Sequence, residues 1–349
     1  MRSLILPSLK RQLNNLILGV AQSHPILHTK GYKLMKISVL DALTLGADLD
    51  LSPLNKFGDV RIFGTTAPNK VEENIADSDV IVINKVKVNK TNLENAKNLK
   101  IILEMATGFD NIDLEYCKEK GIAVCNVVGY STMSVSQITV CMALSLISNM
   151  KTYSTACADG SYSRGSVANI LTPTYHDICG KTWGIVGYGN IGKQVANVAR
   201  ALGCNIIAYK RRPVDDVECV DIDALCKRAD IISVHTPLND GTRNLINKER
   251  IALMKKDAIV INVARGAVCD EKELANAIKE RRIGGLGVDV YTQEPYPITH
   301  PYSEISRYDN TLFTPHMAWG SYESRSRCLD EAIMNLEAFL RGEKRNRLV

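Results

Sequence analysis

Short apolar runs alternate with longer stretches of helical periodicity along most of the 349 residues. Five runs in the first part of the chain are expected to form strands: 37–40, 60–63, 80–83, 101–103 and 122–125. Continuous apolar strands joined by helix-length connections are typical of a parallel sheet that is covered on both faces. The pattern therefore predicts a small α/β domain that begins near Met35.

A second series of apolar runs follows a long apolar helix, which is predicted over residues 133–150 and would link two domains. The strands expected in this series are 183–186, 205–209, 231–234, 258–263, 284–290 and 311–314. Six strands that alternate with helices are the pattern of a doubly wound dinucleotide-binding domain. The helical spacing of Leu329, Ile333, Leu336 and Leu340 predicts a final amphipathic helix.

The formal net charge of +5 is unevenly distributed. Residues 1–34 contain no acidic residue, and their basic residues are Arg2, Lys10, Arg11, Lys30 and Lys33, whereas the rest of the chain is neutral. The excess therefore lies outside the expected domains and gives no reason to expect a nucleic-acid partner. We expect a dispensable or misassigned extension over 1–34, with a helix packed on the body or a targeting segment as the alternatives.

The apolar runs and the cysteines indicate the kind of cellular compartment to expect for this protein. No apolar run approaches the ~20 residues that span a bilayer, so no membrane partner is expected. The ten cysteines form no C-x-x-C pair, and several lie in apolar contexts. We interpret most of them as small buried side chains of a protein in a reducing, cytoplasmic compartment. Their spacing does not match a zinc site, and we expect no metal.

A glycine-rich segment matches the G-x-G-x-x-G pattern, and its residues are Gly187, Tyr188, Gly189, Asn190, Ile191 and Gly192. A predicted strand precedes it and a helical apolar stripe follows it, which is the context that a dinucleotide site needs. Gly187 would permit the tight turn, Gly189 would let the backbone approach a pyrophosphate, and Gly192 would let helix and strand pack closely. The alternative is a glycine-rich turn without a ligand.

The following strand bears on the choice of nucleotide. An acidic residue that binds the ribose 2′-hydroxyl of NAD is expected ~20 residues after the glycines. This region instead contains Lys210, Arg211 and Arg212, which could hold a 2′-phosphate through charge-assisted hydrogen bonds. We therefore favour NADP(H). NAD(H) remains the alternative if Asp215 or Asp216 curls back to the ribose and the basic cluster is only a solvated loop.

Three polar residues follow the last three predicted strands. Arg265, Glu294 and His316 each stand at or just after the end of one of these strands. In an open parallel sheet the carboxyl ends of the strands line the ligand crevice. We therefore expect these side chains to converge from distant positions in the sequence.

Six segments together resemble the D-isomer-specific 2-hydroxyacid dehydrogenase family: 106–113, 187–192, 235–238, 262–266, 287–295 and 314–319. Segments 84–85 and 130–132, and His316 followed by Ala318 and Trp319, are most similar to its glycerate dehydrogenase (hydroxypyruvate reductase) branch. The resemblance implies an α/β protein of two domains with doubly wound parallel sheets. A flavodoxin-like substrate domain would comprise 35–130 and 321–349, and a Rossmann domain 131–320. It also implies a homodimer, with 151–178 as a candidate interface arm.

The family roles carry over residue by residue. Arg265 would bind the carboxylate of a small 2-keto or 2-hydroxy acid, together with the backbone N–H groups of Thr107 and Gly108. His316 would be the general acid in reduction, and Glu294 would favour its imidazolium form and orient the ring. The resemblance also places Asp289 at the nicotinamide amide, Lys85 and Trp319 at the substrate pocket, and Thr236, Pro237 and Ala264 beside the cofactor.

The expected function is NAD(P)-dependent reduction of hydroxypyruvate or glyoxylate. Phosphoglycerate dehydrogenase is an alternative, for which Lys85 is the candidate phosphate ligand. A nucleotide-sensing corepressor without enzyme activity is a second alternative. The remaining histidines, His176, His235 and His300 among them, are interpreted as structural or solvent-exposed.

Overall fold

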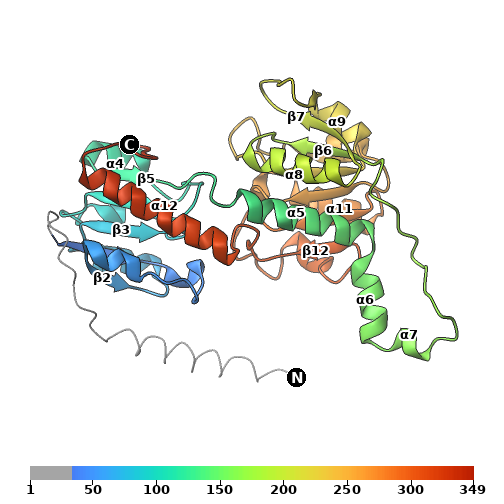
Figure 1. The fold of residues 1–349 in the computed structure, drawn as a ribbon, viewed down its shortest axis with the longest axis horizontal. Helices are drawn as coiled ribbons and strands as arrows, with labels where there is room; N and C mark the ends of the chain where they lie inside the picture. Colours follow the sequence, from blue (N-terminus) through green and yellow to red (C-terminus); the bar gives the residue numbers. More distant parts are fainter. Residues whose placement is uncertain (1–33) are drawn as a thin grey trace.

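The computed structural model describes residues 34–349, so residues 1–33 of the predicted basic extension lie outside the described residues. Two lobes form the described chain, and each is built around a parallel sheet (Figure 1). The predicted α/β class with two doubly wound sheets is confirmed.

The first sheet has the order β2-β1-β3-β4-β5, with every neighbouring pair parallel. Its strands are β1 (Met35–Val39), β2 (Gly58–Ile62), β3 (Val80–Ile83), β4 (Ile101–Glu104) and β5 (Ala123–Cys125). Strands β1, β3, β4 and β5 are almost entirely buried, which explains their nearly continuous apolar sequences. The order 2-1-3-4-5 is that of flavodoxin-like domains.

The second sheet has the order β12-β11-β10-β9-β6-β7-β8, and it is also parallel throughout. Its strands are β6 (Thr182–Val186), β7 (Asn205–Tyr209), β8 (Glu218–Cys219), β9 (Ile231–Val234), β10 (Ile259–Asn262), β11 (Gly285–Val288) and β12 (Thr311–Phe313). The sequence predicted six strands, and the structure adds the two-residue strand β8 at the edge. The chain leaves β6 toward β7 and returns to β9 on the other side of β6, so the carboxyl ends of β6 and β9 border a topological switch point.

Short helices cover the two sheets. In the first domain they are α2 (Val71–Ile75), α3 (Lys90–Leu93) and α4 (Leu114–Lys120), with 3-10 turns η1 (Ala42–Leu45), η2 (Ser52–Phe57) and η3 (Pro68–Lys70). In the second domain they are α8 (Asn190–Ala201), α9 (Ile222–Arg228), α10 (Lys248–Leu253) and α11 (Glu271–Lys279), with η4 (Gly266–Val268) and η5 (Pro301–Glu304).

The helix predicted over 133–150 is interrupted. Helix α5 (Thr132–Ile147) ends before α6 (Met150–Ala158), because Asn149 takes a left-handed conformation with φ of 51°. Helix α6 and the short α7 (Ser161–Arg164) then project from the second domain (Figure 1). Within residues 34–349, no single helix has the length and apolar composition to cross a membrane, whereas α5 and α6, bent by 70°, meet those two criteria as a pair.

The predicted C-terminal helix is confirmed as α12 (Tyr322–Leu340), and it returns to the first domain (Figure 1). Cys328, Leu329, Ala332, Ile333 and Leu336 join the core formed by β1, β3, β4 and β5. This path supports the proposed assignment of 321–349 to the substrate domain. All ten cysteines are free, and six of them are buried.

Candidate active site

The glycine turn lies at the switch point of the second sheet. Gly187 has φ of 99°, and a Cβ there would lie 2.8 Å from the backbone of His235 and Thr236, so the turn fits closely against the end of β9. A Cβ on Gly192 would overlap the carbonyl of Gly187. In contrast, a Cβ on Gly189 would meet nothing within 4 Å, at the point where α8 begins. This open cradle beside a helix N-terminus fits a pyrophosphate.

The segment after β7 carries the basic cluster. Lys210 is half-buried, Arg211 and Arg212 are exposed, and none of the three forms an ion pair with another residue in the range 34–349. The Asp216 carboxylate, a candidate for binding the ribose of NAD, lies 3.2 Å from Lys193 Nζ on α8. The three cations at this edge therefore have no carboxylate partner within the described chain. Asp216, in contrast, already has a cationic partner, Lys193.

The structure brings the side chains of Glu294 and His316, the predicted acid–base pair, into contact. Glu294 Oε2 lies 2.6 Å from His316 Nδ1, although 22 residues separate them. Burial alone would raise the pKa of Glu294, but the hydrogen bond and charge of His316 outweigh it and hold the pKa below its ordinary value. Since Nδ1 faces Glu294, Nε2 is the ring atom left to face a substrate. His316 has a left-handed backbone with φ of 53°, which is uncommon outside glycine and asparagine.

The buried carboxylate of Asp289 holds the turn that carries His316. Asp289 Oδ1 accepts hydrogen bonds from Thr314 Oγ1 at 2.6 Å and from the Met317 N–H at 2.8 Å. Asp289 Oδ2 accepts one from the Ala318 N–H at 2.9 Å. Burial raises the pKa of Asp289, and these hydrogen bonds oppose that rise. The structure thus gives this residue a role that the sequence did not suggest, while its contact with the nicotinamide amide stays a prediction.

Arg265 reaches from the second domain to the first. Its Nη1 donates to the carbonyl of Ala264 at 2.8 Å, and its Nε lies 3.6 Å from Asp110 Oδ2. Its Nη2 lies so close to Gly108 that a Cβ on this glycine would overlap it. The guanidinium therefore lies against the loop in which the sequence predicted carboxylate-binding N–H groups.

Glycine also lets Arg265 approach the loop of Glu294. A Cβ on Gly266 would overlap the backbone between Tyr291 and Thr292. The absence of a side chain at Gly266 therefore brings the segments of Arg265 and Glu294 into contact.

The loop of Thr107 and Gly108 is held by hydrogen bonds with residues 126 and 127. Thr107 Oγ1 donates to the carbonyl of Val127, and the Asn126 amide donates to the carbonyl of Thr107, both at 2.8 Å. Within residues 34–349, the N–H groups of Thr107 and Gly108 make no hydrogen bond. They are thus free to bind a carboxylate.

Lys85 also crosses between the domains. Its Nζ lies 3.5 Å from His316 Nδ1. Partial burial and the charge of Arg265 lower the pKa of Lys85, and Glu294 opposes this. Behind it, Asp41 accepts hydrogen bonds from the backbone N–H groups of residues 84, 85 and 86. Asp41 could not be singled out from the sequence, because its partners are backbone groups more than 40 residues away.

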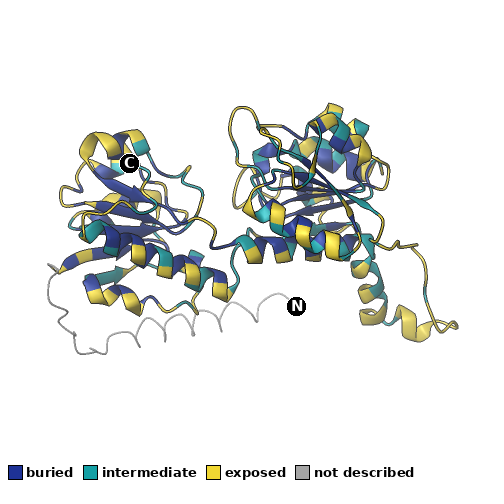
Figure 2. Ribbon diagram, turned by 45° about the horizontal axis from the view of Figure 1, so that its top comes forward, coloured by how far each residue is buried: buried dark blue, intermediate teal, exposed yellow. Residues whose placement is uncertain are grey.

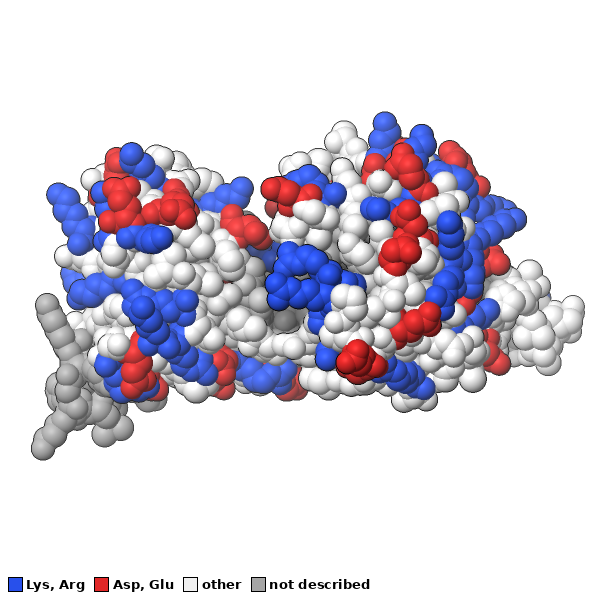
Figure 3. Space-filling view, turned by 90° about the horizontal axis from the view of Figure 1, so that it is seen from above, with Lys and Arg blue, Asp and Glu red and all other residues white. Residues whose placement is uncertain are grey.

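The remaining predicted residues surround this centre. Trp319 packs edge-on against Tyr130, with ring centroids 6.1 Å apart. His235 Nε2 contacts Ser233 Oγ at 2.9 Å, and burial lowers the pKa of His235 to about 3. Thr236 lies against Gly187, as described above, and the carbonyl of Pro237 accepts from Thr242 Oγ1 at 2.7 Å. In the space-filling view the surface is hollowed between the domains, and basic side chains gather there (Figure 3).

Comparison with known proteins places this arrangement in a family. Residues 140–318 match the sequence model described as "D-isomer specific 2-hydroxyacid dehydrogenase, NAD binding domain". A hydroxypyruvate reductase from Blautia hydrogenotrophica is 32% identical over 321 residues, which cover 89% of this chain and 99% of that protein. A D-3-phosphoglycerate dehydrogenase from Methanocaldococcus jannaschii is 36% identical over 318 residues, but these cover only 58% of that protein.

A solved structure has a similar fold. It is an acyclic imino acid reductase in complex with NADPH and D-Arg, and it is 29% identical with a TM-score of 0.79. The alignment covers 90% of this chain and all of that one. The chain thus belongs to the D-isomer-specific 2-hydroxyacid dehydrogenase family, and it is an NAD(P)-dependent oxidoreductase.

Proposed function

We propose that this protein reduces a small 2-keto acid, hydroxypyruvate or glyoxylate, with NADPH as the preferred reductant. The observation that carries the proposal is the arrangement of Arg265 against the loop of Gly108, with the His316–Glu294 pair formed by the loops that follow β12 and β11. The relative named hydroxypyruvate reductase supports the choice of substrate.

The proposed mechanism assigns one task to each group. Arg265 and the N–H groups of Thr107 and Gly108 bind the substrate carboxylate and fix the carbonyl carbon in place. His316 Nε2 gives a proton to the carbonyl oxygen, while Glu294 keeps the ring oriented through Nδ1. Arg265 also stabilises the negative charge that develops on this oxygen. A bound nicotinamide dinucleotide would supply the hydride, and the backbone at Gly189 would leave room for its pyrophosphate.

The basic cluster supports NADPH over NADH. Lys210, Arg211 and Arg212 would surround a 2′-phosphate, and guanidinium groups bind phosphate through paired hydrogen bonds. The ion pair between Asp216 and Lys193 weakens the alternative in which Asp216 binds the ribose of NAD.

The phosphoglycerate dehydrogenase alternative needs a second anion site. Lys85 was its candidate ligand, but the ammonium lies beside His316 Nδ1, on the side of the ring that faces Glu294. This placement favours a substrate without a phosphate. The corepressor alternative is addressed by the assay below.

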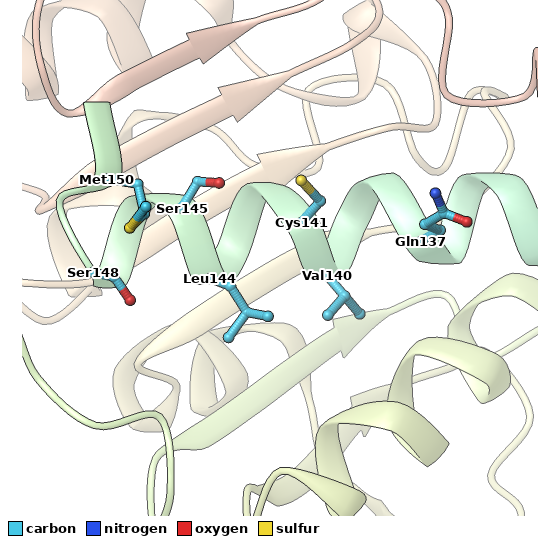
Figure 4. Close-up of a pocket in the computed structure, with 7 residues that line it drawn as sticks. All are labelled: Gln137, Val140, Cys141, Leu144, Ser145, Ser148 and Met150. Carbon is cyan, nitrogen blue, oxygen red and sulfur yellow. The ribbon is translucent and has the colours of Figure 1, made fainter. Parts of the chain in front are cut away.

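We also propose a homodimer in the cytoplasm, with no membrane or nucleic-acid partner. The outer face of α5 forms a shallow hollow lined by Gln137, Val140, Cys141, Leu144, Ser145, Ser148 and Met150 (Figure 4). No residue of the adjoining arm, 151–178, is buried and most are exposed (Figure 2), including Val167 at 62% and Leu171 at 65% exposure. An apolar surface of this kind supports burial against a second copy. The free cysteines support a reducing compartment.

The test is a steady-state screen of 2-keto acids with NADPH and NADH, read from the near-ultraviolet absorbance of the reduced nicotinamide. We expect consumption with hydroxypyruvate or glyoxylate, and His316→Ala should lower kcat by about 10²-fold or more because a positioned acid is lost. His176→Ala is the matched control, since His176 is exposed and, within residues 34–349, makes no hydrogen bond or ion pair with the residues of the site. No turnover across the panel would leave the corepressor alternative, and near-normal turnover in His316→Ala would refute the assignment of the acid.

A further inference from the structure

The segment that carries Glu294 is an exposed loop between two buried ends. Residues 292–295 and 297–299 are exposed, and Ile298 is 90% exposed. Tyr291 and His300, which bound the loop, are both buried. A catalytic carboxylate in such a loop keeps its position only if the loop ends are held firmly, because an exposed loop has few packing contacts of its own.

One carboxylate holds both ends of this loop. Glu271, the first residue of α11, accepts a hydrogen bond from the Thr292 N–H through Oε1 at 2.9 Å. Its other oxygen, Oε2, lies 3.0 Å from His300 Nε2. Both side chains are largely removed from solvent, with 12% of Glu271 and 7% of His300 exposed. The sequence interpretation took His300 as structural or solvent-exposed, and the structure shows that it is buried with Glu271 as its partner.

The hydrogen bonds define the form of the His300 ring. Nδ1 accepts from the Tyr302 N–H at 3.2 Å, so it carries no proton. The ring proton is therefore on Nε2, which donates to Glu271. The ring also packs against Tyr296 and Tyr302, each with a centroid separation of 5.0 Å. The ring of His300 is thus held by two hydrogen bonds and by three aromatic neighbours, since Tyr291 also packs edge-on against it at 6.0 Å.

The loop that Glu271 holds also contacts the turn of His316. Tyr291, which precedes Thr292, donates its hydroxyl to the carbonyl of Thr314 at 2.9 Å. The Tyr291 N–H donates to Glu294 Oε1 at 2.9 Å, which leaves Oε2 for His316. The chain of contacts therefore runs from Glu271 through the loop backbone to both members of the proposed acid–base pair.

We infer that Glu271 and His300 are positioning residues for Glu294, acting as one buried clamp on the two ends of its loop. Neither touches the acid–base pair directly, and the inference rests on the proposed function because it assigns them a task in that chemistry. Loss of the clamp frees the loop, so Glu294 orients His316 in only a fraction of the molecules.

The variant Glu271→Gln tests the clamp with almost no change in shape. A Gln amide can satisfy Thr292 or His300 but not both, because one end of the amide is a donor that faces another donor. We expect kcat to fall by about 10-fold to 100-fold, the range for a displaced catalytic group, with KM for NADPH unchanged. Glu273→Gln is the matched control, since Glu273 lies in the same first turn of α11 and has no hydrogen bond to residues 291–300.

A double-mutant cycle distinguishes positioning from general damage. If Glu271 acts through Glu294, adding Glu271→Gln to Glu294→Gln should lower kcat by less than about 2-fold. The inference would be overturned if Glu271→Gln lowered kcat by the same factor in the wild type and in Glu294→Gln, or if kcat of Glu271→Gln were normal. A normal kcat in Glu294→Gln alone would instead refute the proposed acid–base pair.

Variants at His300 cover the case in which Glu271→Gln does not fold. In His300→Gln the side-chain amide can still donate to Glu271, so kcat should stay within about 3-fold of the wild-type value, whereas His300→Ala should lose as much as Glu271→Gln. Equal kcat values for the two His300 variants would contradict the clamp.

Discussion

At the scale of single residues, the site depends on carboxylates that bind backbone rather than substrate. Asp289 holds the turn of His316, Asp41 holds the loop of Lys85, and Glu271 holds the loop of Glu294. Each accepts N–H groups from a segment that lies outside regular structure. A catalytic loop held in this way loses little entropy when substrate binds, because its conformation is already fixed.

Glu104 is a buried carboxyl without such a full set of donors. It lies at the end of β4 with no exposed surface, and Oε2 accepts only from the Asn111 amide at 3.0 Å, while Oε1 has no partner in the described chain. Burial raises the pKa of Glu104 well above its ordinary value, and the nearby Asp41 adds to this. The folded protein therefore binds a proton that the unfolded chain releases at lower pH.

The expected consequence is a loss of stability with rising pH. Above about pH 4.5 the unfolded chain binds fewer protons at this group, so the free energy of unfolding falls by up to about 1.4 kcal/mol per pH unit until the folded group also ionises. In Glu104→Gln this contribution is absent. The thermal unfolding midpoint of the variant, relative to that of the wild type, should therefore rise between about pH 5 and about pH 8.

The control for this measurement is Glu94→Gln, which changes an exposed carboxylate in the same domain. Its unfolding midpoints should run parallel to those of the wild type. Parallel curves for Glu104→Gln as well would show that Glu104 is ionised in the folded protein throughout this pH range.

At the scale of elements, function lies in the segments that follow the parallel strands. The turn after β6, the segment after β7 and the loops after β9, β10, β11 and β12 supply the residues of the second domain, while those after β1, β3 and β4 supply the first. Two of the three glycines in the turn after β6 have different tasks, because Gly192 faces backbone and Gly189 faces open space.

Alanine at each of these glycines separates folding from binding. Gly189→Ala should leave the thermal unfolding midpoint unchanged and weaken NADPH binding by about tenfold or more, since its Cβ enters the proposed pyrophosphate cradle. Gly192→Ala should lower the midpoint, since its Cβ overlaps the Gly187 carbonyl. Fluorescence titration with NADPH and thermal unfolding would check both, and unimpaired binding by Gly189→Ala would place the pyrophosphate elsewhere.

The segment after β7 carries the prediction on cofactor choice. Lys210→Asp combined with Arg211→Ala should lower the ratio of kcat/KM for NADPH to that for NADH by about tenfold or more, because charged hydrogen bonds to the 2′-phosphate are lost. Lys227→Asp, on the exposed side of α9, should leave the ratio unchanged. An unchanged ratio in the double variant would mean that the basic cluster is only a solvated loop.

The sequence predicted the strands well because a buried parallel strand is a continuous apolar run. All eleven predicted strands are found within two residues of their expected bounds. Strand β8 was missed because a two-residue edge strand, half of it exposed, has no apolar run. The helix over 133–150 was predicted too long because apolar residues continue through Met150, while the left-handed Asn149 between the two helices leaves no mark on that pattern.

The candidate site was predictable only where side chains form motifs. The glycine turn, Arg265, Glu294 and His316 were found because they follow strands within a recognisable spacing. Asp41, Glu271 and His300 were missed because their partners are backbone groups or lie far along the chain. Such contacts depend on the folded path of the chain.

At the scale of the whole molecule, exposed apolar residues of the arm support the proposed dimer. Leu171→Glu should convert a dimer into a monomer, because a buried unpaired charge at an interface is costly. Light scattering coupled to size-exclusion chromatography would measure the mass. Ile62→Glu is the control, since Ile62 is 47% exposed on β2 of the other domain. A mass that stays dimeric in Leu171→Glu would exclude the arm from the interface.

The contacts of Lys85 and Arg265 across the two domains have one more consequence. Lys85 reaches His316 from the first domain, and Arg265 reaches the loop of Gly108 from the second. Each domain alone thus holds only part of the proposed reaction centre. A change in the angle between the domains would separate Lys85 from His316 and Arg265 from Gly108 together, so the relative position of the two domains determines whether the proposed site is complete.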